Sequence, residues 1–247
     1  MRVYLSRWVC RDVETNLARL RAEGDEAGEQ CDLVVFPESF LHGYTRQLDP
    51  LRARQVFAEL SAAHPAVLYV FGSLSEARRN RMTVWRGGLE VAAYDKVHLF
   101  APNGARELWQ PGERYVAVEW GGVTVGLVNC NDLRFPEQCR TLKLQAQCTL
   151  FVAVAWWPWR RDHVWRTLLS ARAIENAAWC LGCCVAASDW EGEMFAGAGN
   201  YVFDPHGEPV RTADDRTYTL DLERIAPPLV DPIADYREVR ETVVLPA

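Results

Sequence analysis

The stretch VTVGLVNCNDLRFPE (Val123–Glu137) holds the pattern that decides the fold. Its first seven residues are mostly apolar or β-branched, which is typical of a strand buried on both faces. Cys130 follows directly, and after a polar turn Pro136 can begin a helix. Ligands in α/β folds gather beyond the carboxyl ends of such strands. The stretch therefore predicts an α/β fold with Cys130 at a ligand-binding edge.

Two further stretches place a reactive side chain at a strand end. LVVFPES (33–39) has Glu38 just past a short apolar run, and AAYDKVHLF (92–100) has Lys96 among apolar residues. The three segments can converge at one edge, although spacing alone does not establish it. Taken singly, each has a simpler interpretation: Glu38 as a helix cap, Lys96 as a surface lysine and Cys130 as a core thiol.

Elsewhere, segments with helical periodicity alternate with strand-like runs. Gly87-Gly88 and Gly121-Gly122 each separate two strand-like runs and predict hairpins. We find no long linker, repeat or domain boundary, so we predict one α/β domain over residues 1–247, with two sheets covered by helices. The predicted helices are 12–29, 51–63, 136–147 and 161–179, and the predicted strands are 2–9, 33–37, 66–74, 82–88, 89–97, 115–120, 123–129, 148–156, 180–187 and 199–205.

The predicted helix 161–179 is apolar or small on most of its circumference, which indicates burial, in part by a second subunit. Arg172 shares a face with Trp165 and Trp179. Because an isolated buried charge is costly, we expect Arg172 to find a structural partner.

Composition excludes several classes of protein. Hydrophobic residues make up 49% and charged residues 24%, as in a soluble globular chain. The 27 Lys and Arg against 33 Asp and Glu give a net charge of −6, which disfavours nucleic acid as a partner. The longest uncharged stretch, Leu144–Trp159, is too short and too polar to span a membrane. With no evident signal peptide, we expect a cytoplasmic protein.

The eight cysteines are irregularly spaced, and several lie inside apolar runs. We interpret them as reduced thiols. Cys180 and Cys183 form a CxxC pair, for which a redox or metal role is the alternative. No second pair or histidine cluster stands at zinc spacing, so we predict a buried structural strand there.

Together these motifs resemble the nitrilase superfamily, the carbon–nitrogen hydrolases with a Glu-Lys-Cys triad. The similarity lies in VVFPESF around Glu38, YDKVHLF around Lys96 and CNDLRFPE around Cys130, followed by WRTLLSARAIENAAW (165–179) and FDPHGEPV (203–210). The resemblance implies Glu38 as general base, Lys96 as oxyanion stabiliser and Cys130 as nucleophile.

The resemblance also implies an auxiliary glutamate, best matched by Glu107 in GARELWQPG, with Glu113 as the alternative. The chemistry explains the main residue types. A thiol needs a base to take its proton, and attack on an amide builds negative charge on oxygen. Lys96 and the backbone N–H of Asn131 are the expected donors to that oxygen. A Cys130 thioester would form and then be hydrolysed, with no metal or organic cofactor.

Several positions depart from the family pattern and affect the pocket rather than the triad. Asn131 follows the nucleophile where many relatives have an aromatic residue, Trp156 stands where a small or amide residue is commoner, and Arg7 stands where glutamine is frequent. Trp109, Trp156, Trp157 and Trp159 suggest an aromatic-walled pocket in which Trp157 contacts substrate, although large aromatic residues are more often part of the core.

We therefore predict a cysteine-dependent hydrolase of non-peptide C–N bonds, with a small-molecule amide as its substrate. An amidase releasing ammonia from a small linear ω-amide is favoured. The alternatives are nitrile hydrolysis, N-carbamoyl amine hydrolysis and, in a different class, a nitrilase-like scaffold that acts through protein association. The resemblance implies a four-layer α-β-β-α sandwich and a homodimer or higher homo-oligomer. The helix that carries Arg172 and the tail, about 226–247, are the candidate subunit interface.

Overall fold

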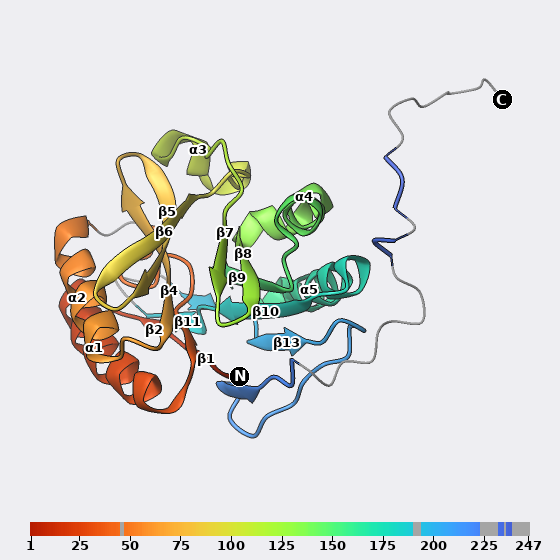
Figure 1. Ribbon diagram of the computed structural model, residues 1–247. Helices are drawn as coiled ribbons and strands as arrows, with labels where there is room; N and C mark the ends of the chain where they lie inside the picture. The colour runs from red at the N-terminus through yellow and green to blue at the C-terminus, as the bar shows by residue number, and fades with distance from the viewer. Residues whose placement is uncertain (45–46, 190–193, 223–231, 235, 239–247) are drawn as a thin grey trace.

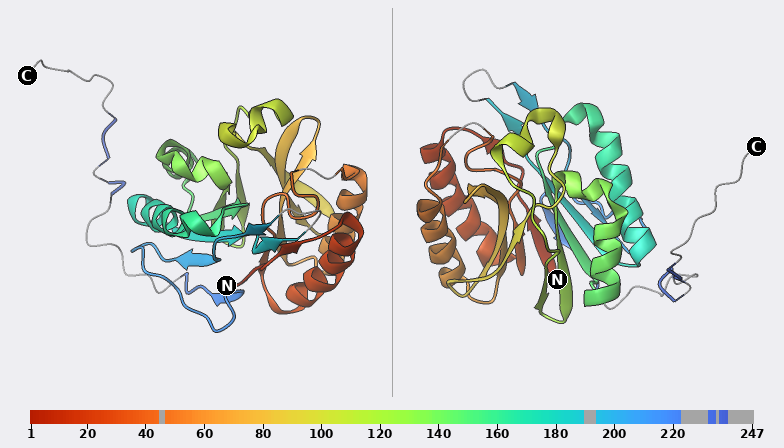
Figure 2. Two further views of the ribbon diagram at one scale, coloured as in Figure 1. Left: turned by 180° about the vertical axis from the view of Figure 1, so that it is seen from behind. Right: turned by 90° about the horizontal axis from the view of Figure 1, so that it is seen from above.

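The protein forms four layers, with two β-sheets between two layers of helices. The computed structural model describes residues 1–44, 47–189, 194–222, 232–234 and 236–238. Figure 1 shows α1 (Val13–Gln30) and α2 (Pro50–Ala63) against one sheet at the left, and α4 (Pro136–Ala146) and α5 (Asp162–Asn176) against the other at the right. The view from above in Figure 2 shows the same order. The predicted α-β-β-α sandwich is confirmed.

Each sheet has parallel strands at its centre and antiparallel strands at its edges. The first sheet has the order β14-β1-β3-β4-β5-β6 and the second the order β13-β10-β9-β8-β7. Strands β3 and β6 run in the same direction, so the chain leaves both at the same edge. The bounds are β1 Arg2–Leu5, β3 Leu33–Val35, β4 Leu68–Glu76, β5 Arg79–Arg86, β6 Leu89–Asp95, β7 Ala117–Trp120, β8 Val123–Asn129, β9 Leu150–Ala155, β10 Trp179–Cys184, β13 Tyr201–Phe203 and β14 Thr217–Thr219.

Shorter elements complete the described part of the chain. A small third sheet has the order β12-β11-β2, with bounds Phe195–Ala196, Ala187–Ser188 and Val9–Cys10. The one-turn helix α3 spans Ala105–Leu108, and the 3₁₀ helices are η1 (Ala101–Asn103), η2 (Cys130–Arg134) and η3 (Trp159–Arg161).

Apolar side chains fill three interfaces between the four layers. Leu33, Val70 and Val152 belong to the core between the two sheets. Val34 and Phe57 belong to the core between the first sheet and helices α1 and α2. A third core lies between the second sheet and helices α4 and α5 and includes Phe151, Trp165 and Leu169. Strands buried on both faces explain why the central segments are continuously apolar in sequence.

Both predicted glycine hairpins are present, joining β5 to β6 and β7 to β8. Gly87 and Gly88 have φ of 57° and 82°, and Gly121 and Gly122 have φ of 58° and 81°. Two consecutive left-handed residues match the twist of a tight antiparallel turn, which favours glycine.

The helix predicted over 161–179 is shorter than expected. It ends at Asn176, because Ala177 adopts a left-handed conformation with φ of 44°, and Trp179 already belongs to β10. Ile174 on its outer side is 51% exposed, so the chain alone does not bury the whole circumference. The tail predicted at a subunit interface, about 226–247, lies outside the described residues except for 232–234 and 236–238.

Both cysteines of the CxxC pair lie in strand β10. The Cys180 side chain belongs to the helix-side core, whereas the Cys183 side chain belongs to the core between the sheets. Side chains three residues apart in a strand point to opposite faces, so the two thiols cannot share a bond or a metal. All eight cysteines are within the described residues, and none forms a disulfide. No described helix has both the length and the apolar character needed to cross a membrane.

Candidate active site

Glu38 follows β3 where the chain packs closely against β4. The chain after β3 passes over Gly72 in β4, where a Cβ atom would lie 1.8 Å from the Pro37 carbonyl oxygen. Only glycine permits this approach. Ser39 has φ of 50°, and its N–H donates to Ser73 Oγ at 3.1 Å. This turn leaves the Glu38 side chain completely buried.

Lys96 meets Glu38 as the chain leaves β6. Its Nζ donates to Glu38 Oε1 at 2.7 Å, and both side chains are buried, with exposures of 3% and 0%. Asn80 Nδ2 donates to the same oxygen at 3.0 Å, while the backbone N–H of Trp156 donates to Oε2 at 2.9 Å. Asn80 Oδ1 in turn accepts from Asn129 Nδ2 at 3.0 Å. The carboxylate is therefore fixed by three donors.

Cys130 occupies a strained turn between β8 and η2. Its φ is 53°, a conformation that is costly for a residue with a side chain and is found mostly where function requires it. The side chain is 8% exposed and opens into a cavity. The N-terminal turn of η2 brings backbone N–H groups without helical partners next to the thiol.

The electrostatics of the three side chains are coupled. Burial disfavours the charged carboxylate, but Lys96 and the other donors hold the pKa of Glu38 below its usual range. Burial also disfavours the ammonium, yet the charge of Glu38 keeps the pKa of Lys96 above its ordinary value. Burial and the Glu38 charge raise the pKa of the Cys130 thiol, which Lys96 only partly opposes. The resting state is a neutral thiol facing a buried ion pair.

Asp132 ties the Cys130 turn to the segment that carries Lys96. Its buried carboxylate accepts from Tyr94 Oη at 2.7 Å, from the His98 backbone N–H at 2.7 Å and from the Asn129 backbone N–H at 3.1 Å. Several partners per carboxylate make such a network rigid. Cys130 and Lys96, which follow strands of different sheets, are therefore held in a fixed position relative to each other.

Arg172 supports the same turn from α5. Its Nε and Nη2 donate to the Leu133 carbonyl oxygen at 3.1 and 3.0 Å, and its Nη1 pairs with Glu175 at 2.7 Å. The prediction that Arg172 is buried and partnered is confirmed.

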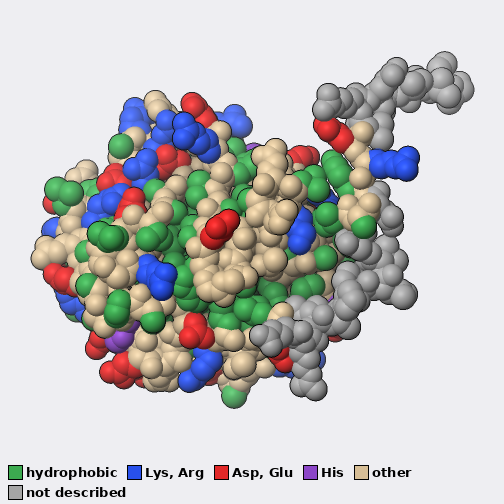
Figure 3. All heavy atoms as spheres, in the orientation of Figure 1, with side chains coloured by type: hydrophobic (Ala, Val, Ile, Leu, Met, Phe, Trp, Pro, Cys, Tyr) green, Lys and Arg blue, Asp and Glu red, His purple; other side chains and the backbone are tan. Residues whose placement is uncertain are grey.

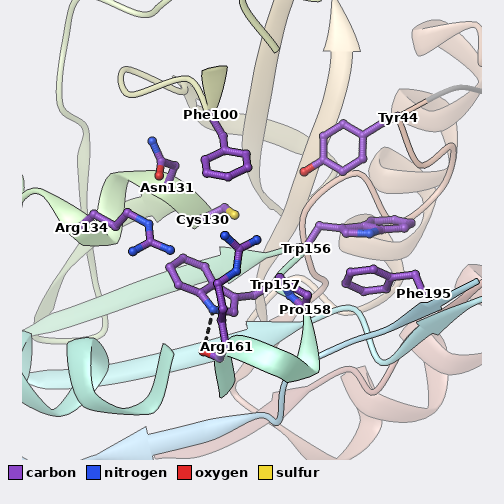
Figure 4. A pocket seen from close by; sticks show the side chains of 10 residues that line it. All are labelled: Tyr44, Phe100, Cys130, Asn131, Arg134, Trp156, Trp157, Pro158, Arg161 and Phe195. Atoms are coloured by element: carbon purple, nitrogen blue, oxygen red, sulfur yellow. Dashed lines mark hydrogen bonds between the residues drawn. The ribbon is translucent and has the colours of Figure 1, made fainter. Parts of the chain in front are cut away.

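Beside Cys130 lies a cavity of about 250 Å³ (Figure 4). Its size is near the lower end of ligand sites, which favours a small ligand. Tyr44, Phe100, Cys130, Asn131, Arg134, Trp156, Trp157, Pro158, Arg161 and Phe195 line it.

The structure brings most predicted site residues together. Glu38 and Lys96 pair beneath the Cys130 thiol, while Asn131 and Trp157 line the cavity. The Asn131 amide donates to the backbone carbonyl oxygen of His98 at 3.1 Å.

Other predicted residues lie elsewhere. The structure does not bring Glu107 to the cluster, because α3 turns its side chain to solvent. Glu113 is also exposed and lines a separate hollow beside β6. Trp109 packs behind Tyr44 at 5.6 Å between ring centroids, and Trp159 is 62% exposed and does not line the cavity.

Sequence reasoning missed several residues of this site. Asn80 lies in β5 at the start of an alternating buried series, Asn80, Met82 and Val84, so a polar residue at an inward position was its signal. Tyr44, Arg134 and Arg161 had no comparable signal, because they lie outside the strands that converge on the site.

The family model for carbon–nitrogen hydrolases matches residues 4–233. The chain belongs to the carbon–nitrogen hydrolase family. Omega-amidase YafV of Escherichia coli (strain K12) is 34% identical to this carbon–nitrogen hydrolase over 200 residues, which cover 78% of this chain and 77% of the relative. A 2-oxoglutaramate amidase of Bacillus subtilis (strain 168) is 30% identical over 194 residues, 74% of each chain.

Among solved structures, XC1258 of Xanthomonas campestris is a carbon–nitrogen hydrolase superfamily protein with an arsenic adduct in its active site. It matches with a TM-score of 0.74 and 26% identity, covering 85% of this chain and 84% of that chain. The comparisons confirm the resemblance to the amidase-like members of the nitrilase superfamily and the fold that it implied.

Proposed function

We propose that this carbon–nitrogen hydrolase is an amidase that releases ammonia from a small linear ω-amide through a thioester on Cys130. The observation that carries the proposal is the buried Glu38–Lys96 pair, with 2.7 Å between Oε1 and Nζ, placed against the Cys130 thiol at the end of a small cavity. A neutral thiol beside an ionised carboxylate is the arrangement that base-assisted nucleophilic attack requires.

In the proposed reaction, Glu38 accepts the thiol proton while Sγ attacks the amide carbonyl carbon. Negative charge develops on the carbonyl oxygen, and Lys96 with the backbone N–H of Asn131 stabilises it. Glu38 then returns the proton to the departing nitrogen, ammonia leaves and an acyl thioester remains on Cys130. Glu38 next takes a proton from water, which attacks the thioester, and the carboxylic acid and the thiol are released.

The relatives and the cavity support the choice of an ω-amide. An omega-amidase and a 2-oxoglutaramate amidase are each at least 30% identical to this chain over about three quarters of its length. The cavity of about 250 Å³ suits a compact acyl chain.

A panel of amides, nitriles and N-carbamoyl amines tests the proposal by ammonia release. We expect ammonia from amides without carbon dioxide, and an acyl adduct on Cys130 by mass spectrometry. Cys130→Ala should show no turnover, since the thioester cannot form. Cys31→Ala, at a buried thiol against α1, is the matched control and should keep its rate. Carbon dioxide release would indicate a carbamoyl substrate instead, and no turnover with any compound would favour the scaffold hypothesis.

We further propose a cytoplasmic homodimer that binds neither nucleic acid nor membrane. Buried cysteines without disulfides support a reducing compartment. Exposed Ile174 and Leu144 on the outer helices α5 and α4 support subunit contact through that layer. Acidic and basic side chains are mixed over the face in Figure 3, in line with the net charge of −6. Light scattering of the wild type and of Ile174→Arg tests the dimer: the wild type should have twice the chain mass and the variant should be monomeric.

A further inference from the structure

One part of the cavity is cationic. Arg134, at the end of η2, and Arg161, at the end of η3, both line it together with Cys130. Figure 4 shows both guanidinium groups beside the thiol. Within the described residues, neither guanidinium donates a hydrogen bond to the protein or forms an ion pair. Two arginines therefore meet at a cavity without a negative partner.

Trp157 organises this pair. The Arg134 guanidinium carbon lies 4.4 Å from the centre of the Trp157 ring, and Trp157 Nε1 donates to the Arg161 carbonyl oxygen at 2.9 Å. Stacking on an aromatic face holds the planar guanidinium without using its N–H groups. The donors of Arg134 stay available to a ligand.

Holding two cations together has an energetic cost. Burial and the charge of Arg161 lower the pKa of Arg134 from its ordinary value. An anion bound between them would relieve the repulsion, and a carboxylate matches the fork of guanidinium donors. The cost of the free site therefore favours an anionic ligand.

The other part of the cavity is aromatic and adjoins Glu38. Tyr44 contacts Trp156 with 5.5 Å between ring centroids, and Trp156 contacts Phe195 at 5.2 Å. The backbone N–H of Trp156 donates to Glu38, and the Tyr44 hydroxyl also faces that carboxylate. Because Glu38 must protonate the departing nitrogen, the amine half of the substrate lies toward these rings. The acyl half then extends toward the arginines.

We propose that Arg134 and Arg161 bind a carboxylate on the acyl half of the substrate and so select monoamides of dicarboxylic acids. The inference rests on the proposed amidase function and adds its specificity site. The carboxylate would accept from both guanidinium groups, while the scissile amide lies at Cys130 with its nitrogen toward Tyr44 and Trp156.

Succinamate and butanamide form the first test, because they have four-carbon acyl chains and differ in the terminal carboxylate. We expect kcat/KM for succinamate to exceed that for butanamide by about 100-fold, as for two charge-assisted hydrogen bonds, mainly through a lower KM. The cationic analogue 4-aminobutanamide should be the poorest substrate. Malonamate, glutaramate and adipamate then measure the distance between the carboxylate site and Cys130, and one chain length should give the highest kcat/KM.

Variants of the cationic part provide the second test. Arg161→Gln should lower the ratio of kcat/KM for succinamate to that for butanamide by about tenfold or more, and Arg161→Lys should restore part of it. Arg134→Gln should act in the same direction. Arg160→Gln removes an equal charge one residue away, at an exposed position that does not line the cavity, and should leave the ratio unchanged.

The outcomes separate this inference from the proposed function. Equal rates with succinamate and butanamide, or an Arg161→Gln ratio equal to that of Arg160→Gln, would overturn the carboxylate site while leaving the amidase intact. An absence of ammonia from every amide would overturn the amidase proposal itself. Circular dichroism of each variant confirms that a lost preference does not come from misfolding.

Discussion

The cavity has a floor and a wall that are built in opposite ways. The floor consists of Glu38, Asn80, Lys96 and Asp132, which are at most 3% exposed. Asn80 and Lys96 donate to Glu38 at 3.0 and 2.7 Å, and Asp132 accepts from Tyr94 Oη at 2.7 Å. The wall consists of Tyr44, Arg134, Trp156, Arg161 and Phe195, of which all but Trp156 are partly open to solvent. Its aromatic side chains contact one another, and its two guanidinium groups lie over aromatic rings.

The difference separates the reaction from its specificity. A closed, fully partnered floor can hold reacting groups in one geometry, as electrostatic stabilisation of a transition state requires. An open wall of large side chains can change with little effect on that geometry. Floor variants should therefore slow every substrate equally, whereas wall variants should change the ranking of substrates.

Replacement of the floor cation should have the largest effect among the following variants. Lys96→Ala removes the ammonium that faces the developing oxyanion and leaves Glu38 buried without a counter-charge. We expect kcat to fall by about 10³-fold or more for every amide, and the free energy of unfolding to fall by about 3–5 kcal/mol. Steady-state kinetics and urea unfolding measure the two effects.

Lys96→Gln keeps a donor to Glu38 without the charge, and should recover stability more than rate. Lys143 is the only other lysine of the chain and lies on α4, so Lys143→Ala is the matched control. Activity of Lys96→Ala within tenfold of the wild type would show that the floor does not act through this cation.

The general base is the next test of the floor. Glu38→Gln keeps the shape and one acceptor oxygen but removes basicity, so acylation should slow by about 10²–10⁴-fold. Rapid-quench measurement of the Cys130 adduct isolates that step. Glu107→Gln, at the exposed glutamate that the family pattern suggested, should stay near the wild-type rate. If the Glu107 variant lost as much activity as the Glu38 variant, Glu107 would also take part in the reaction.

The sequence could predict two residues of the floor, Glu38 and Lys96, together with the nucleophile Cys130. Each of the three follows a strand, which made a common site possible, but the triad itself came from the resemblance of three motifs to the nitrilase superfamily. Asn80 was not predicted because β5 begins at Arg79, three residues before the predicted strand, which starts at Met82. The fold was predictable because periodicity and glycine turns are local signals.

The wall could not be predicted in this way. Arg134 and Arg161 are the last residues of the short helices η2 and η3, and Tyr44 and Phe195 come from segments far apart in the sequence. Their meeting depends on how the layers pack, which no local pattern encodes. Glu107 is the converse case, since a motif position alone suggested a role while α3 places the side chain in solvent.

A substitution in the aromatic part of the wall should alter the ranking of substrates rather than slow all of them equally. Trp156→Leu opens space beside Tyr44 and Phe195 but keeps the backbone N–H that donates to Glu38. We expect the ratio of kcat/KM for an N-methyl amide to that for the primary amide to rise by about tenfold, the effect of about one methylene in a pocket. An equal loss for both substrates would place Trp156 in the floor instead.

The smallest expected effect concerns pH: the contribution of the Glu38–Lys96 pair to the free energy of unfolding should not change near neutral pH. Burial alone would raise the pKa of Glu38, but Lys96 lowers it overall, so the stability that this carboxylate contributes is complete above its unfolded pKa and is lost as pH falls through its folded pKa. Lys96 is the reverse case. Burial lowers the pKa of Lys96, but the charge of Glu38 raises it by more. The stability that Lys96 contributes is therefore lost only as pH rises through the raised pKa.

Both losses lie outside the range between the ordinary pKa values of the two side chains, about 4.3 and 10.4. The difference in unfolding free energy between the wild type and a Glu38→Gln/Lys96→Met double variant should therefore be the same at pH 6 and pH 9. That difference should move against the wild type only below about pH 4 and above about pH 10.5. The double variant is the suitable reference because it leaves neither charge buried alone. A difference that changes between pH 6 and pH 9 would mean that one member of the pair titrates there, and the floor would then lack the fixed charges on which its separation from the wall depends.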